Sequence, residues 1–302
     1  MKSILRHAGT RKGTGLLHGV FFLFAFTVQA IEVVDDTGRI TRLEQPAQRI
    51  ISLAPHTTEL LFEVGAGNKI IGTVPYSTYP PAAKKIPRIG GYKKLDLERI
   101  VSMRPDLIVA WQTGNQPTEM LQLEKLGLNV FYTEPRRLPD IASLMKRLGK
   151  LTGREEQADL AVKQYLKTLQ TLQNRYQGKK RLRAFYLIWD KPLMTVNSEH
   201  LISDVMNLCG LQNIFADIDN LVPRINTEAV LQADPQMIIA GGISKVKPDW
   251  QQQWQRWPEL SANRLNALIE VNPDIIQRHS TRILLGAEEL CRKADRIRAL
   301  TR

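Results

Sequence analysis

Two stretches of the sequence repeat one another and decide the fold. Residues 97–110 read LERIVSMRPDLIVA, and residues 227–240 read TEAVLQADPQMIIA. At this spacing of 130 residues Glu98 matches Glu228, and prolines and apolar positions coincide further along. A repeated segment of about a dozen residues, with a helical pattern followed by an apolar run, indicates two copies of one α/β unit. We therefore expect one lobe of the protein to mirror the other.

Strand and helix patterns alternate on both sides of this repeat. The first lobe, assigned to residues 31–140, opens with two short strands around a turn and continues as strands and helices joined by short loops. A second series of the same kind occupies residues 179–302. Such alternation predicts Rossmann-like lobes with central, mostly parallel sheets.

Residues 141–178 between the lobes have a helical pattern instead. Apolar residues recur there at spacings of three and four: Val162, Tyr165, Leu169, Leu172 and Tyr176. This stripe predicts a long amphipathic helix that ends at Gly178 and is separated from a shorter helix by a break at residues 149–153. The predicted fold class is α/β, with two lobes joined by one long rigid α-helix. A ligand is expected in the crevice at the carboxyl ends of the strands.

The first thirty residues have the layout of a cleavable secretory signal. A basic start is followed by an apolar stretch from Leu16 to Val28 and a small-residue ending at Ala30. The apolar stretch has about 13 residues, fewer than the roughly 20 that span a bilayer. We expect export and cleavage after Ala30, with residues 1–30 as signal peptide, rather than a permanent anchor.

The positive charge of the chain does not indicate a nucleic-acid partner. Removal of the four basic residues of the signal lowers the net charge from +12 to +8. The remaining basic residues are scattered, apart from Arg136 and Arg137 and a run at residues 179–183. Scattered charge of this kind is typical of solvated helix ends, and export removes the chain from nucleic acid.

The chain has two cysteines, Cys209 and Cys291, and both lie in the second lobe. No CxxC or Cys/His spacing suggests zinc, and in an oxidising compartment two such cysteines are expected to pair. The disulfide would fasten the last helix to the second lobe.

The sequence offers no set of catalytic residues. GxSxG, HExxH, P-loop and dinucleotide-binding motifs are absent, and the five histidines, two of them in the signal, form no ligand cluster along the chain. A metal-chaperone function would need acidic, histidine or tyrosine residues at ligand spacings, and no such set occurs. We expect a binding protein without catalytic residues, metal ligands or cofactor.

Short motifs distributed along the chain carry a family resemblance. They read ISLAP at 51–55, TEL at 58–60, YSTYPP at 76–81, LERIV at 97–101, DLIVAW at 106–111, CG at 209–210, NIF at 213–215 and DIIQRHSTR at 274–282. Together they resemble the periplasmic binding proteins that use one rigid helix between lobes to serve importers of cobalamin, haem and iron siderophores. The likeness spans Arg49 to Leu300. It implies a periplasmic location, a small-molecule ligand, the inner-membrane permease of an ABC importer as partner, and a monomer when free.

The resemblance also implies a ligand site on loops that follow strands, formed by Tyr76, Tyr92, Trp111, Asp274, Ile275, Ile276, Gln277 and Arg278. Trp189 has the same kind of position and joins this set. Aromatic faces with neutral hydrogen-bonding groups suit cobalamin or another corrinoid, a large flat ring edged with amides. The alternatives are that these aromatics are core residues, or that the ligand is haem or an iron siderophore. For haem, His279 could bind the iron, while Arg88, Arg224 and Arg278 could bind carboxylates.

Glu98 and Glu228 are implied to receive arginines of the permease. Equivalent carboxylates on two similar lobes are what a two-fold-symmetric transporter would need. The alternative is that each glutamate only stabilises the positive end of its helix.

Overall fold

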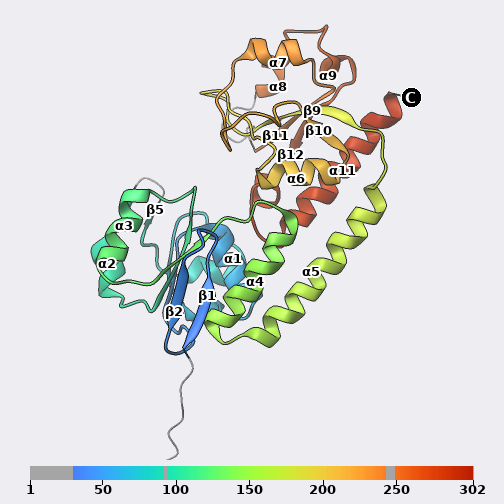
Figure 1. The fold of residues 1–302 in the computed structure, drawn as a ribbon. Coiled ribbons are helices and arrows are strands. Elements are labelled where there is room, and N and C mark those ends of the chain that lie inside the picture. Colours follow the sequence, from blue (N-terminus) through green and yellow to red (C-terminus); the bar gives the residue numbers. More distant parts are fainter. Residues whose placement is uncertain (1–29, 92–93, 243–248, 302) are drawn as a thin grey trace, which may run out of the picture.

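The computed structural model describes residues 30–91, 94–242 and 249–301, and it has two lobes connected by a long helix (Figure 1). The predicted signal residues 1–29 and Tyr92 lie outside the described residues. Within the described ranges, no helix combines the length and apolar character that a membrane span requires.

The first lobe is built on a four-stranded parallel sheet with the strand order β4-β3-β7-β8. An antiparallel hairpin of β1 (Ile31–Val34) and β2 (Ile40–Leu43) precedes it. The sheet strands are β3 (Ile50–Ser52), β4 (Ile70–Thr73), β7 (Leu107–Trp111) and β8 (Val130–Thr133). The remaining elements are α1 (Pro55–Glu63), α2 (Leu97–Ser102), α3 (Pro117–Lys125) and the short pair β5 (Gly90–Gly91) and β6 (Lys94–Leu95).

The second lobe has a parallel sheet with the order β10-β9-β11-β12. Its strands are β9 (Leu182–Leu187), β10 (Leu211–Asn213), β11 (Met237–Gly241) and β12 (Leu268–Val271). Its helices are α6 (Leu201–Leu208), α7 (Thr227–Ala233), α8 (Trp250–Trp254), α9 (Ser261–Arg264), α10 (Pro273–Ile276) and α11 (Ile283–Leu300). The predicted α/β class with two mostly parallel lobes is confirmed.

The internal repeat is a repeat of structure. Helix α2 and strand β7 recur 130 residues later as α7 and β11, in the same place of an equivalent strand order. The side-chain contacts recur as well, since Arg49 binds the carbonyl oxygen of Met103 and Arg183 binds that of Ala233. In both lobes an arginine at the start of a central strand therefore ties that strand to the end of the repeated helix.

Two helices form the connection between the lobes. Helix α4 (Leu138–Thr152) ends at Gly153, whose φ of +62° lies in the left-handed region that favours glycine, and α5 (Glu155–Tyr176) follows. The predicted break between the helices exists, but it is shorter than residues 149–153, because α4 continues to Thr152 and only Gly153 and Arg154 separate it from α5. The long helix was predicted to end at Gly178, and it ends two residues earlier at Tyr176. The predicted linker 141–178 covers all of α5 and most of α4.

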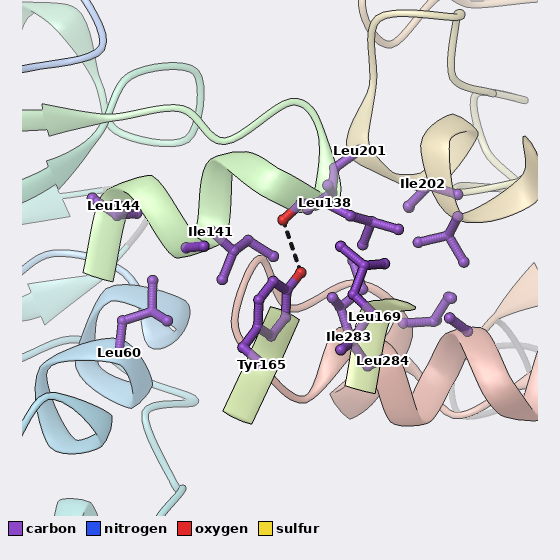
Figure 2. Packing of buried hydrophobic residues seen from close by; sticks show 14 of the residues in the cluster. Leu60, Leu138, Ile141, Leu144, Tyr165, Leu169, Leu201, Ile202, Ile283 and Leu284 are labelled. Carbon is purple, nitrogen blue, oxygen red and sulfur yellow. Dashed lines mark hydrogen bonds between the residues drawn. The ribbon is translucent and has the colours of Figure 1, made fainter. Parts of the chain in front are cut away.

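The hydrophobic core continues through this connection from one lobe to the other. Figure 2 shows Leu60 of α1 facing Ile141 and Leu144 of α4, and the cluster extends across α5 to Ile283 of α11. The hydroxyl of the buried Tyr165 donates a hydrogen bond to the carbonyl oxygen of Leu138 at 2.9 Å. The lobes are thus joined by closely packed side chains rather than by flexible strands.

The predicted disulfide between Cys209 and Cys291 is confirmed. It joins the residue after α6 to the middle of α11, and both cysteines are fully buried. Arg298, in the last turn of α11, donates a hydrogen bond to the carbonyl oxygen of Cys209. The last helix is therefore held to the second lobe by a covalent bond and a charged hydrogen bond.

Candidate ligand-binding site

Tyr76 lies on the loop that follows β4, and its side chain is 77% exposed. Its φ of +66° is unusual for a residue with a side chain, and such backbone strain is often found at functional sites. Two hydrogen bonds to Ser77 fix the loop. The hydroxyl of Thr73 donates to the hydroxyl of Ser77 at 2.9 Å, and Arg88 donates to the carbonyl oxygen of Ser77 at 2.9 Å. An aromatic ring is thus presented to solvent by a fixed backbone.

Trp111 is the last residue of β7, and its ring is half-buried. A Cβ at Gly114 would come within 1.8 Å of the indole, so the ring's position requires glycine there. The side chain of Asn115 accepts a hydrogen bond from the backbone N–H of Trp111 at 2.6 Å and donates one to the carbonyl oxygen of Leu53 at 3.0 Å. The loop after β7 therefore fixes this indole at the carboxyl edge of the sheet.

Arg88 and Glu134 mark two sides of this edge. Arg88 donates hydrogen bonds to backbone carbonyl oxygens of its own loop, including that of Ile86 at 2.7 Å. Its guanidinium therefore stabilises the loop. Glu134 is buried and accepts from the N–H of Thr113 at 2.9 Å. Burial raises the pKa of Glu134, and the hydrogen bonds from Thr113 partly offset this rise.

The second lobe contributes Trp189 and the segment from Asp274 to Arg278. Trp189 follows β9, is 49% exposed, and donates from its indole to the carbonyl oxygen of Lys191 at 2.9 Å. Arg278 pairs with Asp274 at 3.3 Å and also reaches the carbonyl oxygen of Tyr76 at 3.3 Å. Tyr76, Asp274 and Arg278 are therefore brought together across the boundary between the lobes.

The predicted residues of this segment do not all face the same way. Gln277 is half-buried and donates to the carbonyl oxygen of Gly241 at 3.0 Å, while Ile275 is also half-buried. Ile276, in contrast, is fully buried in the hydrophobic core, so it presents no surface to a ligand. In the short helix α10 the side chain of Ile276 points into the core, while its neighbours Ile275 and Gln277 remain partly accessible.

A second set of inter-lobe contacts lies beside these residues and was not predicted from the sequence. Glu59 of α1, which is buried, accepts hydrogen bonds from the hydroxyl of Ser280 at 2.5 Å and from Arg282 at 3.1 Å. Burial raises the pKa of Glu59, although the hydrogen bond from Ser280 and the charge of Arg282 act in the opposite direction. The guanidinium of Arg282 also stacks over the ring of Tyr79 at 4.1 Å. The residues immediately after Arg278 thus dock the second lobe onto the first.

His279 lies within this docking segment and is buried. Its ring centroid is 5.3 Å from that of Trp111, 5.4 Å from that of His56 and 5.6 Å from that of His200. The imidazole is therefore packed among three other rings, not presented to a ligand. This position disfavours the interpretation in which His279 binds haem iron, and among the described residues no group of three His, Cys, Asp or Glu could hold a metal ion.

Glu98 and Glu228 occupy equivalent positions on the two lobes. Each is exposed and is the second residue of its helix, α2 or α7. Asp96 and Asn226 cap these helices by accepting a hydrogen bond from the backbone N–H three residues on, at 3.0 and 2.9 Å. Each cap satisfies one backbone N–H of its helix, and both glutamate side chains remain exposed to solvent.

The fold and site can be compared with those of known proteins. The sequence model of the periplasmic binding protein family matches residues 50–275. The chain belongs to this family. It is a periplasmic binding protein, and its relatives are binding proteins for small molecules.

The similar proteins include the vitamin B12-binding protein of Yersinia pestis (strain Pestoides F). It is 36% identical over 254 residues, which cover 84% of this chain and 89% of that protein. The solved structure of the periplasmic vitamin B12 binding protein of Vibrio cholerae has a TM-score of 0.78 at 33% identity, covering 84% of this chain and 98% of that one. A periplasmic haem binding protein from Pseudomonas aeruginosa has a TM-score of 0.70 at 21% identity, covering 81% and 91%. At that identity the likeness concerns the fold alone.

Proposed function

We propose that the protein binds cobalamin or a related corrinoid between its lobes and delivers it to the permease of an ABC importer in the inner membrane. The observation that carries this proposal is the 36% identity to a vitamin B12-binding protein over 84% of the chain. In this function the protein is a monomer when free, takes no part in catalysis and needs no cofactor of its own.

The chemistry of the candidate site supports this ligand. Tyr76 and Trp189 offer exposed aromatic faces from opposite lobes, and such faces stack well on a flat, weakly charged ring. Asp274 and Arg278 lie side by side as an ion pair, so together they can both accept hydrogen bonds from amides and donate to them. A corrinoid carries both features, since its ring is fringed with amide groups.

Titration calorimetry of the mature protein at pH 7.5 with cyanocobalamin, cobinamide and haem tests the ligand. We expect binding of a corrinoid with one site per protein. Trp189→Ala and Tyr76→Ala should each weaken it about 3- to 10-fold, the value of one aromatic contact. Leu160→Ala is the matched control, because Leu160 is 70% exposed on α5, and its affinity should not change. Heat with haem and none with either corrinoid would refute the proposed ligand.

We further propose that Glu98 and Glu228 receive cationic residues of the permease, one on each lobe. The double variant Glu98→Ala, Glu228→Ala should bind the ligand normally and fail to stimulate transport by the reconstituted importer. Glu155→Ala with Glu156→Ala is the matched control, because these glutamates are also exposed in the first turn of a helix, α5. If both double variants support the same uptake, the two glutamates only stabilise their helices.

A further inference from the structure

All three histidines that follow the predicted signal lie in one buried cluster. His56 belongs to α1 of the first lobe, His200 precedes α6 of the second, and His279 lies between them on the segment from Arg278 to Arg282. The ring of His279 is 5.4 Å from that of His56 and 5.6 Å from that of His200. The cluster therefore occupies the contact through which the second lobe docks onto the first.

A hydrogen bond at His200 and burial at His56 and His279 favour the neutral form of these imidazoles. Nδ1 of His200 accepts a hydrogen bond from the N–H of Ile202 at 3.1 Å, so it caps α6 only while that nitrogen carries no proton. Nε2 of His56 and Nδ1 of His279 are buried, and neither has a hydrogen-bond partner among the described residues. An added proton would thus break a helix cap at His200 and leave a buried charge unpaired at His56 or His279.

The charged groups around the cluster disfavour protonation of the three imidazoles. Positive charge comes from Arg278 on the same segment and from Arg136, which approaches His200 from the loop before α4. Arg282 is neutralised by Glu59 of α1, and Asp204 of α6 accepts from the backbone N–H that begins α4. Among the described residues, no carboxylate forms a hydrogen bond with any of the three imidazoles.

We propose that this cluster joins the lobes only while its imidazoles are neutral, so that mild acid loosens the lobe contact and weakens retention of the ligand. The ligand part rests on the proposed function, and the lobe part does not. Arg278 of the candidate site and Ser280 and Arg282 of the docking contact belong to one five-residue segment, so loosening the contact also frees a predicted ligand residue.

The sign of the effect follows from burial. Burial lowers the pKa of His200 to about 3 and that of His279 to about 4, and it lowers the pKa of His56 well below its ordinary value. The open state, with ordinary pKa values near 6.5, then binds more protons than the closed state. The closed state is therefore favoured at neutral pH and loses its advantage as the pH falls from about 6.5 toward 4. Each imidazole that reaches water on opening shifts the closed-to-open ratio by about 30-fold at pH 5.

Hydrogen exchange of the ligand-free mature protein, corrected for the intrinsic effect of pH, measures the opening of residues 278–290. We expect protection there to fall at least about 10-fold between pH 7 and pH 5, an effect smaller than that of one fully released imidazole. His56→Gln with His279→Gln should remove most of this fall, and His279→Leu serves as a second variant if the double one does not fold. Unchanged protection in the wild type, or an equal fall in the folded variants, would overturn the proposal.

Glu59→Gln is the control for the buried carboxyl of Glu59 at this contact. Because burial raises the pKa of Glu59, acid favours the closed state through this group, opposite to the histidines. The acid-induced fall in protection should therefore persist in Glu59→Gln, and its loss there would assign the effect to Glu59 and refute the histidine cluster. Calorimetry with cyanocobalamin at pH 7 and pH 5 tests the ligand part of the proposal separately. If no corrinoid binds at either pH, the proposed ligand is wrong, while the result of the hydrogen-exchange experiment still holds for the lobe contact.

Discussion

Removal of the disulfide should destabilise the protein by an amount that its loop length sets. Cys209 and Cys291 are 82 positions apart in the sequence, and for a loop of this length the chain-entropy model gives about 4.5 kcal/mol at 25 °C. The bond constrains the unfolded chain, whereas in the native state α6 and α11 also pack through buried apolar side chains. The variant Cys209→Ala, Cys291→Ala should therefore fold to the same structure with a smaller free energy of unfolding.

Urea unfolding followed by circular dichroism measures this loss. With a slope of about 3 kcal/mol per molar urea, the midpoint should fall by about 1.5 M. Wild-type protein unfolded in the presence of a reductant is the matched control, since it lacks the bond but keeps both sulfur atoms. The difference between the two samples gives the cost of the small cavities that alanine leaves, about 1 kcal/mol for each. A total loss below about 1 kcal/mol would show that the bond does not act through the unfolded chain.

Three further substitutions test other features of the structure. Gly114→Ala should displace the Trp111 ring and weaken corrinoid binding about 3- to 10-fold in calorimetry, because the added Cβ would lie 1.8 Å from the indole. Tyr165→Phe should lower the free energy of unfolding by about 1 kcal/mol, since it leaves the buried carbonyl oxygen of Leu138 without its donor. Trp250→Ala should cost about 3–5 kcal/mol in the same urea assay, because this indole is fully buried in the second lobe.

The parts of the fold that the sequence predicts are those with local patterns. The two short strands expected around a turn at the start of the first lobe are β1 and β2, which the turn residues between them make recognisable. The repeat was visible because helix α2 and strand β7 lie next to one another in sequence, so that their pattern recurs as one block. The long helix α5 followed from a stripe at spacings of three and four.

The contacts between the lobes could not be predicted in the same way. His56, His200 and His279 are separated by 144 and 79 residues, and no periodicity connects them. They come together because α4 and α5 pack against both lobes and place the second lobe beside the first, and this packing leaves no local sequence pattern. Ile276 was misplaced for a different reason, since a helix of four residues is too short for a pattern that identifies its inward face.

The two copies of the repeat are alike in their helices and differ at the ends of their strands. At the spacing that pairs Glu98 with Glu228, Trp111 at the end of β7 corresponds to Gly241 at the end of β11. A Cβ at Gly241 would lie 2.2 Å from the hydroxyl of Tyr186, so no side chain fits there and the second lobe cannot present an indole at that point. The repeated helices α2 and α7 therefore remain alike, as the proposed two-fold partner would require, while the strand ends beside them differ, as the proposed asymmetric ligand would require.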